Sequence, residues 1–186
     1  MAQPIYIVSG FPRSGTSMMM RAVEAGGISC VYSPIGDANR NRNTMIPGYV
    51  PNPHGFYEDA PLPPDDWAEY RGRAVKVIHD NLHAIPPGER LRVVYMRRDP
   101  QEIRRSYVGI MSGPHPRPFA WLDGYAQQVD ADIEQLSAIC ASVAVLSYAD
   151  VVRDPVRQLT DLEWPLDVSQ AAATIDAKLY RHRGAA

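Results

Sequence analysis

The residues best suited to chemistry lie between Gly10 and Ser17, in the sequence GFPRSGTS. The apolar run Ile5 to Val8 before them predicts a buried parallel strand, and Ser17 to Ala25 after them has a helical pattern that ends at two glycines. A glycine-bounded loop between a strand and a helix presents backbone N–H groups, and the first helical turn adds the positive end of the helix dipole. The segment therefore predicts a phosphate-binding site.

The loop departs from the pattern of nucleoside triphosphatases at one position. That pattern is G-x-x-x-x-G-K-[ST]. Gly10, Gly15 and Ser17 match it, but Thr16 occupies the position of the lysine, and the cation of the loop is Arg13. Because the lysine contacts the β- and γ-phosphates, its absence makes the site poorly suited to splitting a triphosphate. Such a loop could still hold one phosphate of a different donor.

A second pair of phosphate-binding residues follows the strand predicted at Leu91 to Met96. Arg98 comes just after this strand, and Ser106 lies eight residues further on, in the helical pattern Gln101 to Met111. A guanidinium offers a fork of N–H donors to phosphate oxygens, and a hydroxyl adds a third hydrogen bond. Hydrogen bonds to charged groups contribute roughly 1.5–3 kcal/mol each. The spacing therefore predicts recognition of a further phosphate.

Together these two motifs resemble those of the sulfotransferases. FPRSGTS is similar to the family's 5′-phosphosulfate loop, usually YPKSGTT, and Arg98 and Ser106 have the spacing of its 3′-phosphate motif. The segments SYADVVRDP and KLYRHRG are looser matches, so the resemblance covers nearly the whole chain. It implies an enzyme that uses 3′-phosphoadenosine 5′-phosphosulfate (PAPS) as donor and needs no metal.

The resemblance also implies a role for each residue of the loop. Arg13, in the family's lysine position, would hold the bridging and leaving oxygens of the donor. The N–H groups of Ser14, Gly15, Thr16 and Ser17 would surround the 5′-phosphate, with the two hydroxyls of Thr16 and Ser17 assisting. An arginine keeps the charge of the lysine but is not a mobile proton donor, which puts acid assistance to the leaving group in doubt.

Three residues are candidates for the remaining catalytic work. AVKVIH resembles the family's VKTH segment, in which the lysine helps the donor and the histidine is the base, but here one extra residue separates Lys76 from His79. On a strand, one residue reverses the face, so both can keep their roles only if the strand ends between them. Glu58, beside two aromatic residues, is an alternative base that would need burial to raise its pKa.

Strands and helices alternate along the chain, and this predicts an α/β fold: a P-loop three-layer sandwich with a central parallel sheet. Ligands of such folds bind at the carboxyl ends of the strands, where the two motifs would meet. Beyond the segments above, the predicted strands are Arg73 to His79 and Ser142 to Ser147, and the predicted helices are Phe119 to Ala138, Val156 to Leu162 and Val168 to Ile175.

Composition excludes several classes of function. The 186 residues fit a single domain, 1–186, and a net charge of −2 gives no case for binding nucleic acid or a membrane. No apolar run approaches the length of a membrane span, and no signal peptide is recognisable at the N-terminus. Cys30 and Cys140 form neither a disulfide framework nor a metal set, so we expect buried thiols in a cytoplasmic protein.

Two hypotheses of different class follow. The first is a small sulfotransferase, whose acceptor is a small molecule or a carbohydrate bound partly by the loop Ser33 to Pro64. The second is a nucleotide-binding or interaction protein that keeps the fold without catalysing transfer; the missing loop lysine and the displaced histidine favour it. A small-molecule kinase is a more distant third, because the loop lysine is absent. The sequence sets no oligomeric state.

Overall fold

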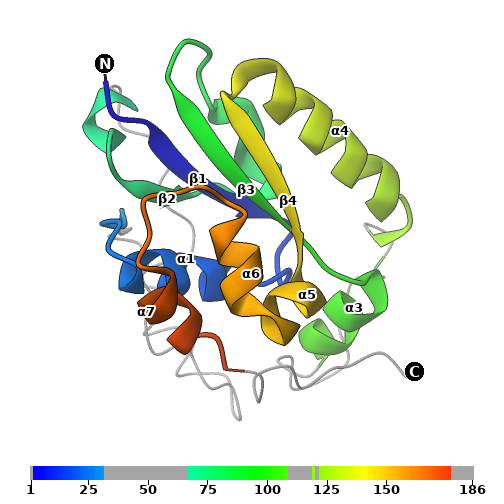
Figure 1. The fold of residues 1–186 in the computed structure, drawn as a ribbon. Helices are drawn as coiled ribbons and strands as arrows, with labels where there is room; N and C mark the ends of the chain where they lie inside the picture. The colour runs from blue at the N-terminus through cyan, green and yellow to red at the C-terminus, as the bar shows by residue number, and fades with distance from the viewer. Residues whose placement is uncertain (1, 32–66, 109–118, 120–121, 177–186) are drawn as a thin grey trace, which may run out of the picture.

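The computed structural model describes residues 2–31, 67–108, 119 and 122–176, and these contain a four-stranded parallel sheet (Figure 1). The strands lie in the order β2-β1-β3-β4. Their bounds are Ile5–Gly10 for β1, Ala74–Lys76 for β2, Leu91–Arg97 for β3 and Ser142–Ser147 for β4. The prediction of an α/β fold with a central parallel sheet is confirmed.

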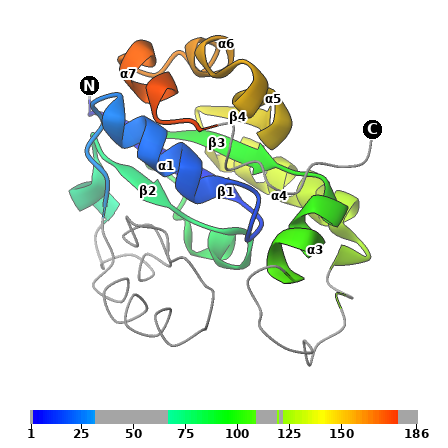
Figure 2. The same ribbon diagram turned by 90° about the horizontal axis from the view of Figure 1, so that it is seen from below.

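Helices cover both faces of this sheet. On one side lie α1 (Thr16–Ala25), α5 (Tyr148–Arg153), α6 (Pro155–Thr160) and α7 (Val168–Ala173), and on the other lies α4 (Tyr125–Ile139) (Figures 1 and 2). The short 3₁₀ helices η2 (Trp67–Tyr70) and η3 (His79–Ala84) belong to the same side as α4. Helix α3 (Pro100–Val108) follows β3. The predicted three layers are therefore present.

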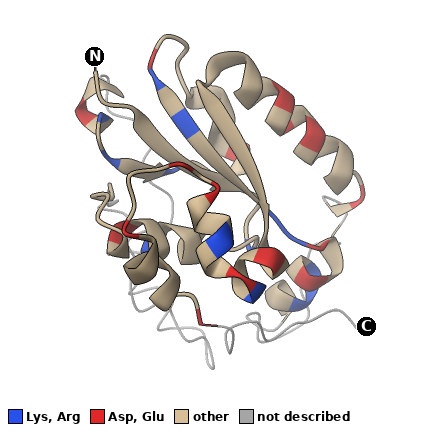
Figure 3. Cartoon of the chain, viewed as in Figure 1, with Lys and Arg blue, Asp and Glu red and all other residues tan. Residues whose placement is uncertain are grey.

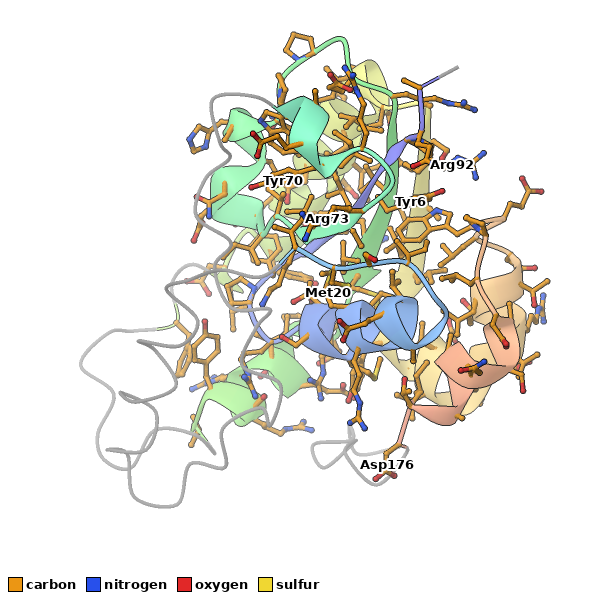
Figure 4. All side chains as sticks on the ribbon, turned by 90° about the vertical axis from the view of Figure 1, so that its left-hand side faces the viewer. Tyr6, Met20, Tyr70, Arg73, Arg92 and Asp176 are labelled. Carbon is orange, nitrogen blue, oxygen red and sulfur yellow. The ribbon has the colours of Figure 1, made fainter. Side chains whose placement is uncertain are left out.

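Alternation along β1 divides the core in two. Tyr6 and Val8 pack with α1, where Met20 lies in the same apolar layer (Figure 4), while Ile5 and Ile7 pack toward α4. The side chains of these four β1 residues are at most 6% exposed, which is the pattern of a central strand covered on both faces.

Two predicted elements have different bounds in the structure. The strand expected at Arg73 to His79 ends at Lys76, and η3 begins at His79, because Asp80 and Asn81 favour turns over extended backbone. The helix expected to start at Phe119 starts at Tyr125, since the chain makes a turn before it and Gly124 is its N-cap. The segment 147–155, expected only as a family-like stretch, contains α5.

The register of the sheet brings the two predicted phosphate motifs to one edge. Ser9 pairs with Tyr95 and Gly10 pairs with Met96, so the loop after β1 and the turn after β3 leave the sheet side by side. Asp99 caps α3 by accepting hydrogen bonds from the N–H groups of Gln101 (2.8 Å) and Glu102 (3.1 Å). Among the described residues no helix is long and apolar enough to cross a membrane.

Both cysteines are free thiols, and their surroundings predict low reactivity. Burial raises the pKa of Cys30 to about 12 and that of Cys140 to about 11. Since only the thiolate attacks disulfide reagents, we expect no reaction of the native protein with Ellman's reagent at pH 8 and full reaction of both thiols in urea. A thiol that reacts rapidly before unfolding would contradict this, and a Cys140→Ser variant would show which one it is.

Candidate functional site

The loop between β1 and α1 is held in a conformation that requires glycine at two positions. Gly10 has φ +139° and Gly15 has φ +102°. A Cβ atom at Gly10 would lie 2.5 Å from the carbonyl oxygen of Met96, and one at Gly15 would overlap the ring of Tyr148. Arg13, which is not a glycine, also has a left-handed backbone with φ +69°. Left-handed backbone at such a residue is uncommon and is concentrated at functional sites.

The N-terminal end of α1 is open to an anion. Gly15 is the N-cap, no side chain of the described residues caps this end, and no acidic residue lies in the first turn. The first intrahelical hydrogen bond of the helix runs from the N–H of Met19 to the carbonyl of Gly15 (3.0 Å). The N–H groups of Thr16 and Ser17 therefore precede the intrahelical ladder, as a phosphate site needs.

Not every group predicted for this site is available. The N–H of Ser14 donates to the carbonyl of Phe11 (3.1 Å) within the loop, so in this conformation it is not part of the anion site. The Ser14 hydroxyl is buried, and it has no hydrogen-bond partner among the described residues. The predicted set of N–H donors is thereby reduced to Gly15, Thr16 and Ser17.

Arg13 and Ser106 meet directly, although 93 residues separate them. The Nε of Arg13 donates to the Ser106 hydroxyl at 3.1 Å, and Arg13 is otherwise exposed while Ser106 is buried. The structure thus brings the cation of the loop and the hydroxyl of the second motif together. Figure 3 shows basic residues along the turn from β3 into α3 at the same edge of the sheet.

Arg98 is a buried part of this site. Its side chain is only 7% exposed; Nε donates to Glu102 at 3.0 Å and Nη1 donates to the carbonyl oxygen of Arg13 at 3.0 Å. The guanidinium lies over the ring of Tyr148, 4.1 Å from its centre. Binding of a 3′-phosphate by Arg98 stays a prediction, whereas its contact with the backbone of the loop is observed.

Lys76 supplies a second positive charge from the neighbouring strand. Its Nζ donates to the hydroxyl of Ser17 at 3.3 Å. In the nucleoside-triphosphatase pattern a lysine occupies the position of Thr16, in the loop itself. Here the ammonium group of Lys76 reaches the first turn of α1 from the end of β2 instead. The condition that allowed both Lys76 and His79 to take part is met, because the strand ends between them.

His79 has a carboxylate partner that the sequence analysis did not find. Its Nδ1 lies 2.7 and 2.9 Å from the two oxygens of Asp132, a buried residue of α4, and the hydroxyl of Tyr95 donates to the same carboxylate at 2.5 Å. The imidazole stacks on Phe11, with 4.0 Å between ring centres and 17° between the planes. The candidate base is therefore fixed against a residue of the loop between β1 and α1.

A signal for Asp132 exists in the sequence. Tyr125, Val129 and Leu136 are buried positions of α4, and Asp132 lies on the same face. A carboxylate among the core positions of an amphipathic helix demands a partner, because an unpaired buried charge is costly. The same reasoning points to Glu102, which is buried on α3 beside Arg98.

One predicted candidate, Glu58, lies outside the described residues, as do the whole loop Ser33 to Pro64 and the basic segment 178–184. Within the described residues, no group of three or more side chains is arranged to hold a metal ion.

Comparisons with known proteins give a distant structural likeness. No family model matches the sequence, and no curated protein is similar to it. Among solved structures, a sulfotransferase, STF9 from Mycobacterium avium, is similar with a TM-score of 0.47 and 12% identity, over 100% of this chain and 70% of that one. At this distance the proposed function has to rest on the geometry of the site.

Substitution of Gly15 tests how tightly the loop is held. An alanine there must adopt a left-handed backbone and displace the Tyr148 ring, so we expect Gly15→Ala to lower the free energy of unfolding by about 2–4 kcal/mol. Gly27→Ala is the matched control: Gly27 has φ +98°, but no described atom lies within 4 Å of an added Cβ. This control should lose only about 1 kcal/mol. Chemical unfolding of both variants measures the difference, and equal losses would contradict the packing of Tyr148 on the loop.

Proposed function

We propose that this protein transfers a sulfuryl group from PAPS to a hydroxyl or amine of a small-molecule or carbohydrate acceptor. The observation that carries the proposal is the contact of Lys76 Nζ with Ser17 at the open end of α1, in a loop that has Thr16 in the lysine position. The site keeps the anion-binding backbone of a phosphate loop but places its cations differently from a nucleoside triphosphatase. This suits a donor with a single 5′-phosphate.

The residues present fit the 5′ end of such a donor. The left-handed glycines and the uncapped end of α1 offer backbone donors, and Lys76 and Arg13 offer two positive charges. When bound, PAPS would supply an activated sulfuryl group on the oxygen of its 5′-phosphate. The chain's own contribution would be to hold that phosphate and to stabilise the charge that grows on it as the sulfur–oxygen bond breaks.

The acceptor side would be handled by His79. Its imidazole lies on Phe11, next to the loop, and its side chain is 24% exposed, so one ring nitrogen can face a substrate. In the proposed reaction the acceptor's oxygen or nitrogen forms the new bond to sulfur, and its proton passes to His79. The bond from sulfur to the bridging oxygen breaks, and its electron pair stays on the departing 3′,5′-ADP.

Arg13 would act at two places in turn. In the described structure its Nε is bonded to Ser106. For Arg13 to hold the leaving oxygens, its side chain must turn from Ser106 toward the end of α1, and Ser106 then becomes available to a 3′-phosphate. This movement of Arg13 from Ser106 to the 5′-phosphate would make binding at the 5′-phosphate position favour binding of the 3′-phosphate by Ser106.

A second candidate function is favoured by the burial of Arg98. Its guanidinium is already engaged by Glu102 and by the carbonyl of Arg13, which is the arrangement of a structural residue. A protein in which Arg98 only supports the loop would bind a 5′-phosphate without reading a 3′-phosphate. This is the non-catalytic nucleotide-binding alternative.

Removal of the Lys76 charge tests the donor site. We expect Lys76→Met to weaken the binding of 3′,5′-ADP about tenfold or more, because a hydrogen bond to a charged group contributes roughly 1.5–3 kcal/mol. Lys76→Arg should keep most of the affinity. Calorimetric titration measures both, with ATP and magnesium as the competing ligand. Tighter binding of ATP with magnesium than of 3′,5′-ADP would overturn the donor assignment.

A second titration separates the two roles of Arg98. If it reads the 3′-phosphate, Arg98→Lys should weaken 3′,5′-ADP at least tenfold more than 5′-AMP, since an ammonium cannot reproduce the guanidinium fork. If it only supports the loop, both ligands should weaken equally, as the second candidate predicts. Arg92→Lys, at the opposite end of β3 and bonded to the carbonyl of Glu163, is the matched control and should change neither.

A further inference from the structure

The contacts of His79 define which of its nitrogens is available. Nδ1 lies within hydrogen-bond distance of both oxygens of Asp132. A carboxylate only accepts hydrogen bonds, so the proton of the neutral imidazole belongs on Nδ1. Nε2 then carries the lone pair, and Oδ1 of the exposed Asp80 lies 3.9 Å from it.

Asp132 is itself fixed by a second donor. The Tyr95 hydroxyl donates to Oδ2 at 2.5 Å, from a side chain in the fully buried middle of β3. Burial and the adjacent carboxylate both raise the pKa of Tyr95, so its hydroxyl keeps its proton. Asp132 thus receives one hydrogen bond from the sheet and one from η3, and its side chain is only 8% exposed.

The surroundings of the imidazole are defined on every side that the structure describes. Asp132 faces it from α4, Asp80 from η3, and Tyr95 stands behind Asp132 on β3, with the positive charge of Arg97 near Tyr95. Phe11 covers one ring face, and Phe11 in turn packs edge-on against Tyr125 at 4.9 Å. The ring is therefore constrained in both tilt and rotation.

The geometry points to Asp132 as a positioning residue that holds His79 in the Nδ1–H tautomer, with Tyr95 as its support, so that Nε2 is the base of the reaction. The role in transfer rests on the proposed function; the tautomer itself does not. During transfer the acceptor's proton would bond to Nε2, and the imidazolium that results would donate from Nδ1 to Asp132, which stays ionised. The same logic governs the aspartate of the serine protease triad.

The substitution Asp132→Asn has a specific expected effect. Because Tyr95 donates to Oδ2, the amide oxygen of an asparagine should take that position, which lies 2.7 Å from Nδ1, and its NH₂ group should replace Oδ1, which lies 2.9 Å from Nδ1. The amide oxygen favours a proton on Nδ1 and the NH₂ group favours a proton on Nε2, so the carboxylate's preference for the Nδ1–H tautomer is lost. The tautomer preference would therefore fall while the volume of the side chain is kept.

Nitrogen-15 correlation spectra of the imidazoles test this without any assay of transfer. The His79 signal is assigned by its loss in His79→Gln, at a pH where the ring is neutral. We expect protonated Nδ1 in wild type, a mixture of both tautomers in Asp132→Asn, and protonated Nδ1 in Tyr95→Phe, which keeps the carboxylate. Asp130→Asn, an exposed position of the same helix, is the matched control and should leave the spectrum unchanged. Protonated Nε2 in the wild type would overturn the proposal, even if Asp132→Asn failed to fold.

The functional arm uses the wild type, Asp132→Asn and Asp130→Asn in a transfer assay with labelled PAPS and a panel of hydroxyl and amine acceptors. We expect kcat to fall about 10–100-fold in Asp132→Asn, because the imidazolium loses a charged hydrogen-bond partner, with the affinity for 3′,5′-ADP within about twofold of wild type. A purely structural role would instead lower both, or neither. If wild type transfers nothing while the tautomer is as expected, the proposed function fails and the arrangement of His79 stands. Activity of Asp132→Asn within a few-fold of wild type would overturn the role in transfer.

Discussion

The contact between the guanidinium of Arg98 and the carbonyl of Arg13 connects the two halves of the site. The side chain of Arg98 is 7% exposed, and a buried guanidinium is tolerated only when it has partners. Its partners here are the carboxylate of Glu102, the carbonyl oxygen of Arg13 and the ring face of Tyr148. The same contact holds the carbonyl of a residue with left-handed backbone. The loop is thereby shaped by the protein before any ligand binds, and preorganised donors are what electrostatic stabilisation of a developing charge requires.

The positive charges around this loop come from elements that are far apart in the chain. Arg13 lies within the loop, Lys76 arrives from β2, and Arg98 lies after β3. Each follows or ends a parallel strand, so the carboxyl edge of the sheet collects them in the way that α/β folds collect ligand-binding residues. One lysine of the nucleoside-triphosphatase pattern is in effect replaced by a charge from the next strand. This difference separates the site from one built for a triphosphate.

Most strands and helices can be predicted from the local sequence pattern, but most of the side-chain contacts between them cannot. The strands β1 and β3 and the glycine-bounded loop can be predicted because burial on both faces and left-handed turns restrict the residue types. Strand β4 can be predicted from its short apolar, β-branched run, although most of its residues are half-buried or exposed. The sequence pattern extended β2 to His79, whereas the strand ends at Lys76. The apolar residues Val77 and Ile78 continue the strand pattern, and the turn-forming Asp80 and Asn81 follow so closely that the pattern does not locate the end of the strand. Asp132 and Tyr95 could be noticed only as polar groups in apolar patterns. The pairing of Asp132 with His79 and Tyr95 is set by the packing of α4 on the sheet, which no local pattern encodes.

The order of the strands has a consequence for how the site comes into being. The loop at residues 10–17 contacts residues that follow three different strands. Arg98, after β3, donates to the loop carbonyl of Arg13, and Tyr148, after β4, packs against Gly15. His79, after β2, stacks on Phe11. Parallel pairings of this kind close long segments of chain and form slowly compared with local structure. The loop can therefore adopt this arrangement only in a chain whose sheet is complete out to β4. During synthesis, residues 10–17 emerge first, and their contact with Tyr148 can form only after about 130 further residues have been added.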